Sequence, residues 1–104
     1  MIINVGTINL VIYVWDEAKR ADNLAKHGID FSLVEGFEWD TALIAPDARR
    51  DYGELRFSAF GLIEDRLFNL VFTPRAGQVR VISLRRANRR EVRDYVDQTQ
   101  DQDT

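Results

Sequence analysis

Arginine is concentrated near the carboxyl end of this 104-residue chain. The stretch from Arg75 to Arg93 contains seven arginines and one acid, Glu91, whereas residues 1–74 carry seven bases and twelve acids. A guanidinium presents a planar fork of donors that can pair with two phosphate oxygens at once. The segment therefore indicates a site for anions such as the phosphates of RNA. The solvated face of a basic helix would give the same composition, so this alternative stays open.

Proton transfer near neutral pH has one obvious candidate, His27, because it is the only histidine of the chain. Its unperturbed pKa lies close to neutrality, which suits a general acid or base. His27 also stands directly before Gly28, at the expected end of a helix. An imidazole there is equally well explained as a cap or as a partner of the helix dipole. The sequence favours the cap and leaves catalysis as the alternative.

The composition limits the kinds of site that this chain can build. It contains no cysteine, which excludes disulfides and thiolate metal sites, and one histidine does not make a typical zinc site. We therefore expect no metal and no cofactor. The opening apolar run has no basic start and is too short to span a membrane, so we expect a cytoplasmic protein without membrane contact. The net charge of −3 argues against nonspecific binding of nucleic acid over the whole surface.

Helical spacing occurs first in residues 16–27, where Asp16 offers a capping oxygen and Gly28 a helix stop. We expect the apolar residues of this helix to face the core: Ala18, Ala21, Leu24 and Ala25. The opposite face carries Lys19, Asn23 and Lys26. A second, weaker helix is predicted from Asp30. We expect Trp39 to belong to the core.

A β pattern follows, in four runs separated by turn-forming residues: 42–46, 55–63, 67–73 and 78–84. Short connections favour antiparallel neighbours, and the link 74–77 would bring Thr73 opposite Gln78 in a hairpin. A first strand is predicted at residues 10–14. A last helix begins at the cap candidate Asn88 and turns Val92, Tyr95 and Val96 inward.

The fold class is therefore α+β, with two N-terminal helices, an antiparallel sheet of about four strands and a C-terminal helix. The length fits one domain, which we assign to residues 1–97. The polar residues 98–104 are predicted to form a disordered tail.

Three segments together resemble the BrnT family of bacterial toxins: WDEAKRADNLAKHGIDF at 15–31, RRDYGELRFSAFG at 49–61 and VFTPRAGQVRVISLRRANRREVRDY at 71–95. The shared pattern is W-D-x-x-K, then N-x-x-K-H-G, E-x-R, R-x-I/V-S-x-R-x-A and a final E. The resemblance implies a RelE-like ribonuclease fold, metal-independent cleavage of RNA and a cognate antitoxin of the BrnA type. Residues 1–10 precede the usual start of such toxins.

The family pattern keeps a base at three positions, Lys26, Arg56 and Arg85, which could hold the negative charge of a phosphorane transition state. The family's acid matches Glu91, which could accept a proton but is better explained as the residue that orients the arginines. Together with His27, these are the catalytic candidates. The alternative for the charged residues is a set of surface ion pairs. We assign the other arginines to RNA phosphates or to the antitoxin: Arg75, Arg80, Arg86, Arg89, Arg90 and Arg93.

We expect a toxin of a type II toxin–antitoxin system that cleaves RNA as a metal-independent endoribonuclease and so inhibits translation. RNA and a BrnA-type antitoxin are the expected partners, and operator DNA would be reached only through the antitoxin. The alternative is a catalytically silent module that binds the antitoxin and modulates its binding to operator DNA.

Tyr95 could stack on a base or donate a proton, although its spacing favours the core.

Overall fold

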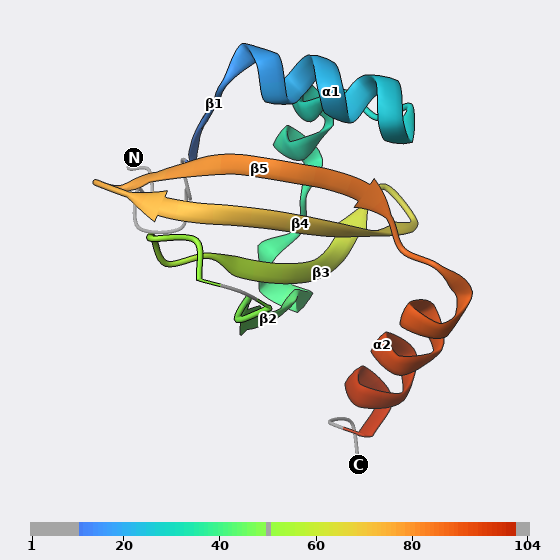
Figure 1. The fold of residues 1–104 in the computed structure, drawn as a ribbon. Coiled ribbons are helices and arrows are strands. Elements are labelled where there is room, and N and C mark those ends of the chain that lie inside the picture. The colour runs from blue at the N-terminus through green and yellow to red at the C-terminus, as the bar shows by residue number, and fades with distance from the viewer. Residues whose placement is uncertain (1–10, 50, 102–104) are drawn as a thin grey trace, which may run out of the picture.

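The computed structural model describes residues 11–49 and 51–101. The predictions for residues 1–10 and 102–104 lie outside the described residues. The elements, drawn in Figure 1, are β1 (Ile12–Trp15), α1 (Glu17–His27), the 3-10 helices η2 (Phe31–Gly36) and η3 (Trp39–Thr41), β2 (Leu43–Pro46), β3 (Phe57–Ile63), β4 (Arg66–Arg75), β5 (Gln78–Arg86) and α2 (Arg89–Asp101).

The strands form one mixed sheet of five in the order β1-β5-β4-β3-β2. β2 to β5 are antiparallel neighbours, as predicted, but β1 joins the edge of the sheet parallel to β5. The prediction of an antiparallel sheet of about four strands therefore holds for β2 to β5, but the sheet has a fifth strand, β1, and is mixed. The partners Ile12 and Gln78 lie far apart in sequence, and a local pattern carries no information on such a pairing.

The hairpin between β4 and β5 is tighter than predicted. Arg75 lies opposite Gln78, and Thr73 lies opposite Arg80 rather than Gln78. The loop consists of Ala76 and Gly77, both with positive φ, at 46° and 80°. Two-residue loops of this kind match the right-handed twist of the strands, and β4 continues through Pro74 to Arg75.

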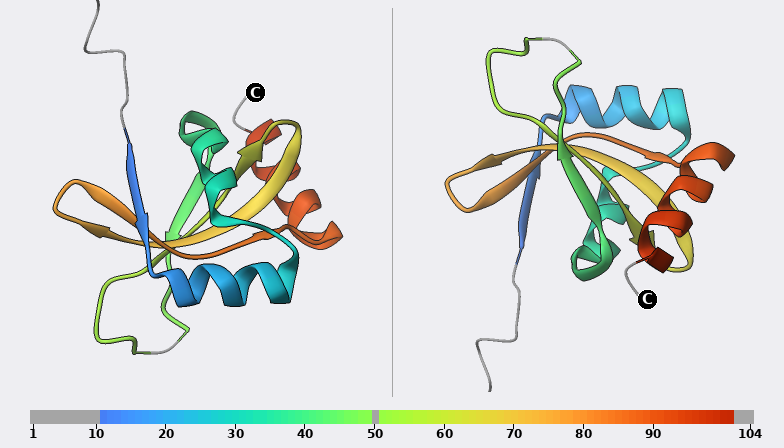
Figure 2. Two further views of the ribbon diagram at one scale, coloured as in Figure 1. Left: turned by 90° about the horizontal axis from the view of Figure 1, so that it is seen from above. Right: turned by 90° about the horizontal axis from the view of Figure 1, so that it is seen from below.

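One face of the sheet carries the hydrophobic core, to which η2 contributes, whereas α1 runs along the β5 edge (Figures 1 and 2). The largest fully buried side chains are Phe31, Leu70, Leu84, Val34 and Val81. Trp39 packs against this cluster, as predicted, and its indole N–H donates to the Tyr13 hydroxyl at 2.7 Å. Within the described ranges, no helix is long and apolar enough to cross a membrane.

The caps of α1 agree with the sequence, but its orientation does not. The Asp16 carboxylate accepts from Ala18 N–H, and Gly28 ends the helix in the left-handed region. Asn23, which was expected on the solvent side, is the buried residue of α1, and Leu24 is 42% exposed. The rest of the predicted inward stripe is exposed as well: Ala18, Ala21 and Ala25. Alanine stripes bury little apolar area, so the hydrogen bonds of one asparagine outweigh them here.

The second predicted helix is a single 3-10 segment, η2, capped by Asp30 through a hydrogen bond to Ser32 N–H at 2.9 Å. The last helix, α2, continues to Asp101, so the prediction of disorder is wrong for residues 98–101. The Thr99 hydroxyl donates to the carbonyl of Tyr95, one turn earlier in the same helix, at 2.8 Å.

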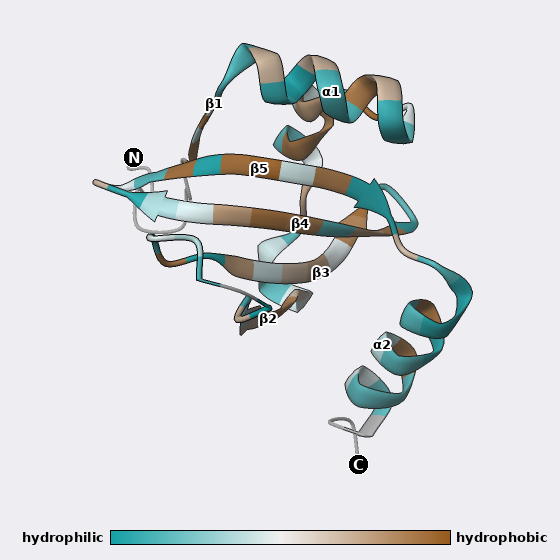
Figure 3. Cartoon of the chain, viewed as in Figure 1, coloured by the Kyte–Doolittle hydropathy of each residue, from teal (hydrophilic) through white to brown (hydrophobic). Residues whose placement is uncertain are grey.

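The predicted inward face of α2 is only partly covered. Val92 and Val96 remain 39% and 38% exposed, and most of the helix is hydrophilic (Figure 3). α2 projects from the end of β5 beyond the sheet, whereas hydrophobic residues gather on the central strands (Figures 1 and 3). This helix is therefore held by few contacts.

Candidate functional site

Arg85 and Glu91 form a two-bond ion pair at the junction between β5 and α2. The two terminal nitrogens of the guanidinium donate to the two carboxylate oxygens, at 2.9 and 3.0 Å. Only 33% of the Arg85 side chain and 18% of the Glu91 side chain are exposed. A bidentate pair of this kind fixes the plane of the guanidinium. The sequence prediction that Glu91 orients an arginine is consistent with this geometry.

Glu91 is also part of the start of α2. The Asn88 side chain accepts from Glu91 N–H at 2.8 Å, and the Glu91 carboxylate accepts from Asn88 N–H at 2.9 Å. This reciprocal arrangement is a capping box. The Arg85 guanidinium, followed by the Asn88 amide, holds the pKa of Glu91 below its ordinary value despite partial burial. Glu91 is therefore ionised and a weak proton acceptor at neutral pH.

The last turn of α1 brings Lys26 and His27 to the same end of β5. Both are exposed, and α1 runs beside β5 in Figures 1 and 2. Partial desolvation lowers the pKa of His27, and the positive charges of Lys26 and Arg85 lower it further. An imidazole that is neutral at pH 7 can accept a proton.

The structure also bears on the cap proposed for His27. The end of α1 is closed by the backbone, since Gly28 N–H donates to the Leu24 carbonyl at 2.8 Å. The imidazole is therefore not needed to close the helix. An interaction with the helix dipole remains compatible with its position.

A small surface hollow lies between α1 and β5. It is lined by Lys19, Asp22, Asn23, Lys26, His27, Ile82 and Ser83. We call this hollow, together with Arg85 and Glu91 beside it, the α1–β5 groove. The groove joins a neutral imidazole to two cations from different elements, a combination suited to proton transfer next to a phosphate.

Arg56 lies in a second polar cluster. Its guanidinium stacks over the Tyr52 ring, 4.0 Å from the centroid, and its Nε donates to Glu54 at 3.1 Å. Arg75 reaches the other oxygen of Glu54 at 3.4 Å. Because Thr73 pairs with Arg80 across the hairpin, Arg80 belongs to the same end of the sheet.

The structure does not bring Arg56 next to Arg85. Arg85 lies opposite Asn69, which lies opposite Phe60 on β3. Arg56 precedes Phe60 by four residues, a separation of about 13 Å along an extended chain. The three predicted cations therefore separate into Lys26 and Arg85 at one end of the sheet and Arg56 at the other.

The remaining predicted arginines are on the surface near the start of α2. Arg86 ends β5, and Arg89 and Arg90 form the first turn of the helix. All three are exposed, as is Arg93 on the next turn of α2. They add positive charge at the junction between β5 and α2.

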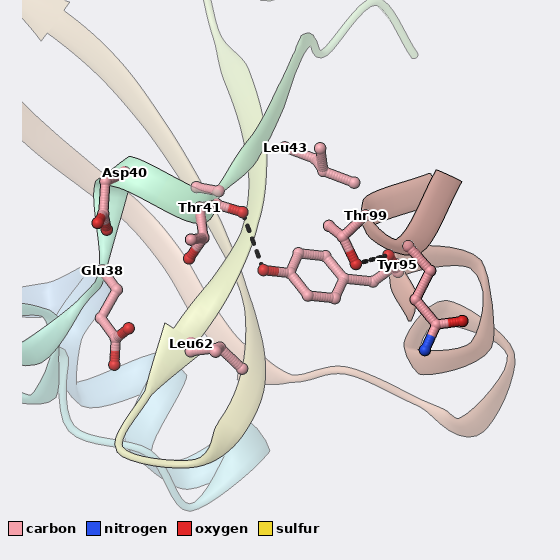
Figure 4. A pocket seen from close by; sticks show the side chains of 9 residues that line it. Glu38, Asp40, Thr41, Leu43, Leu62, Tyr95 and Thr99 are labelled. Carbon is pink, nitrogen blue, oxygen red and sulfur yellow. Dashed lines mark hydrogen bonds between the residues drawn. The ribbon is translucent and has the colours of Figure 1, made fainter. Parts of the chain in front are cut away.

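Tyr95 holds α2 to the body of the protein instead of entering the core. Its hydroxyl donates to the Thr41 carbonyl at 2.9 Å, and its ring borders a hollow that also contains Glu38 and Asp40 (Figure 4). Two acids at this hollow make it a poor place for a phosphate.

Asn23 is the residue whose position the sequence analysis missed. It is 5% exposed, and its carboxamide hydrogen-bonds both the N–H and the C=O of Leu84, the residue before Arg85. The available signal was its place in the pattern N-x-x-K-H-G, one helical turn before Lys26 and His27. Within the described residues, no group of three or more His, Cys, Asp or Glu side chains could hold a metal ion.

Comparison with known families identifies the chain. Residues 15–91 match the family model described as the ribonuclease toxin BrnT of type II toxin–antitoxin systems. The chain belongs to the BrnT family. This membership makes it a ribonuclease toxin of a type II system and implies an RNA substrate and a cognate antitoxin. The matched residues include all five catalytic candidates, whereas most of α2 lies beyond them.

A solved structure supports the same assignment. The crystal structure of the Brucella abortus ribonuclease toxin, BrnT, is 32% identical, with a TM-score of 0.61. The alignment covers 77% of this chain and 100% of the Brucella chain. No curated protein matches the chain. The BrnT-like α+β fold is therefore supported by both sequence and structure.

Proposed function

We propose that the chain is a metal-independent endoribonuclease that cleaves RNA in the α1–β5 groove and thereby inhibits translation. The observation that carries the proposal is that Lys26 and His27 on α1 line one hollow with Ser83 of β5, near Arg85. The Arg85 charge also helps to lower the pKa of His27. Family membership supplies the reaction class, and this arrangement supplies the groups that such a reaction needs.

In the proposed reaction, His27 takes the proton of the 2′-hydroxyl. The 2′ oxygen attacks the adjacent phosphorus, the bond to the 5′ oxygen breaks, and a 2′,3′-cyclic phosphate forms. The 5′ oxygen leaves with a proton from the imidazolium or from water. Lys26 and Arg85 hold the additional negative charge of the phosphorane. The lowered pKa of His27 supports its role as base, because the imidazole is then neutral at pH 7.

Glu91 is proposed to orient Arg85 rather than to transfer a proton. A guanidinium has five N–H donors. The described contacts of Arg85, to Glu91 and to the Arg86 carbonyl, occupy three of them. The Nε–H and one terminal N–H remain for a phosphate, and the bidentate pair fixes the direction in which they point.

Arg56 was predicted from sequence to be catalytic, and we now propose a different role. With Arg75 and Arg80 it would contact RNA phosphates next to the cleaved one, because it is offset from Arg85 by about 13 Å along the strand direction. The exposed residues Arg86, Arg89 and Arg90 would bind further phosphates or the antitoxin. We also propose that the antitoxin is of the BrnA type, and that operator DNA is reached only through it.

The test is RNA cleavage by the purified chain in excess EDTA. We expect fragments with 2′,3′-cyclic phosphate ends, and growth arrest with loss of messenger RNA when the chain is produced alone in bacteria. A requirement for a divalent metal, or 5′-phosphate ends, would contradict the proposed chemistry. A folded chain that cleaves nothing and arrests nothing would favour the silent antitoxin-binding module.

A further inference from the structure

The sheet has an incomplete edge beside the α1–β5 groove. β1 accompanies β5 only as far as the pair Trp15 and Val81, although β5 continues to Arg86. From Asp16 the chain turns into α1, which runs along the rest of that edge (Figures 1 and 2). A strand edge covered in this way needs new partners for its backbone N–H and C=O groups.

Asn23 supplies those partners. Its side-chain oxygen accepts from Leu84 N–H at 3.1 Å, and its side-chain nitrogen donates to the Leu84 carbonyl at 2.7 Å. The same nitrogen donates to the Ile29 carbonyl at 3.0 Å. The carboxamide thus replaces one residue of the missing strand and joins three segments: α1, the chain after Gly28, and β5.

The position of Asn23 gives these bonds a further consequence. Lys26 and His27 follow it by one helical turn, and Arg85 follows Leu84 directly. A rotation or slide of α1 would therefore have to break the bonds to Leu84 before Lys26 and His27 could move away from Arg85. The contact fixes the spacing between groups on two different elements.

We propose that Asn23 is a positioning residue for RNA cleavage, because its carboxamide locks the last turn of α1 onto β5 and so sets Lys26 and His27 against Arg85. This inference rests on the proposed function. A merely structural role would lower stability but would leave the electrostatic coupling between His27 and Arg85 intact in the folded protein. The two roles can therefore be separated experimentally.

The first measurement uses no RNA. The pKa of His27 is determined by NMR titration in four proteins: the wild type, Arg85→Gln, Asn23→Ser, and the double variant. In the wild-type background, removal of the Arg85 charge should raise the pKa of His27. In the Asn23→Ser background, removal of the Arg85 charge should raise the pKa of His27 by less than half as much as in the wild type. Asn23→Leu serves as a second variant, and Ala25→Ser, on the exposed side of α1, is the control.

The second measurement is cleavage of a short RNA by the folded variants. We expect kcat to fall about 100-fold with little change in KM, as for misplaced catalytic groups. The inference would be overturned if Arg85→Gln raised the pKa of His27 as much in the Asn23→Ser background as in the wild type. It would also be overturned if kcat were unchanged in either Asn23 variant, or if neither variant folded. The titration does not depend on activity. A wild-type chain that cleaves no RNA would therefore refute the proposed function, while the titration would still show whether Asn23 couples His27 to Arg85.

Discussion

Glu91 illustrates why residue type alone does not assign a catalytic role. Its carboxylate is engaged by Arg85 and by the capping box with Asn88, and its pKa is lowered. Such an acid is a poor base at neutral pH. His27 has the opposite character, since its lowered pKa leaves the imidazole neutral. The sequence favoured a helix-end role for His27; the backbone of Gly28 closes the helix, and an interaction of His27 with the helix dipole stays compatible with its position.

At the residue scale, Arg85→Ala should abolish growth arrest at equal expression and lower the cleavage rate about 100- to 1,000-fold, because a fixed donor to the developing charge is lost. Stability should fall by only about 1 kcal/mol, since the pair with Glu91 is partly exposed. Cleavage kinetics and urea denaturation measure the two effects. Arg66→Ala, at an exposed arginine that begins β4, is the control. A toxic Arg85→Ala variant would remove Arg85 from the mechanism.

At the element scale, local signals predicted elements well and their partners poorly. Asp16, Asp30 and Gly28 marked helix ends correctly because capping depends on neighbouring residues. The parallel pairing of β1 with β5 could not be predicted in this way, because it joins distant segments.

The orientation of α1 shows a second limit of sequence patterns. Hydrophobic spacing pointed Leu24 inward, but the helix lies on a strand edge that requires hydrogen bonds, so Asn23 faces inward instead. The same limit applies to the site. Sequence resemblance named Arg56 and Arg85 together, and only the strand register separated them.

Deletion of residues 98–104 tests the contribution of α2. The deletion removes the last turns of the helix, including Thr99, so helix content measured by circular dichroism should fall. Growth arrest should persist, because the family match ends at Glu91 and the α1–β5 groove contains no residue beyond Glu91. Loss of toxicity in a truncated chain that remains folded would show that α2 takes part in RNA cleavage.

At the scale of the whole molecule, charge is divided between an acidic body and a basic strand–helix segment. The net charge of the chain is −3, yet residues 75–93 contain seven arginines and a single acid, Glu91. Binding of RNA should therefore be local and strongly dependent on salt. The same separation of charge would suit an acidic antitoxin segment that covers the groove.

The salt dependence of RNA binding tests the second cluster. If Arg75 contacts a phosphate, Arg75→Ala should reduce the slope of log K against log salt concentration by about 0.7, the value for one contact to a single strand. Fluorescence anisotropy with a short labelled RNA, at several salt concentrations, measures the slope. Arg66→Ala should leave it unchanged. An unaltered slope for Arg75→Ala would assign this arginine to the ion pair with Glu54 alone.

The most direct test of the account is single-turnover cleavage of a short RNA in EDTA across about pH 5 to 9, the range in which an imidazole changes charge. The wild-type rate should rise with pH through a pKa below the ordinary histidine value and then level off, because only the neutral imidazole accepts the proton. His27→Gln should lower the rate about 100- to 10,000-fold and remove the inflection. Glu91→Gln, whose glutamine can keep the capping box, should retain the inflection in the pH profile. A fully active His27→Gln variant with the wild-type pH profile would contradict the proposed chemistry of the α1–β5 groove.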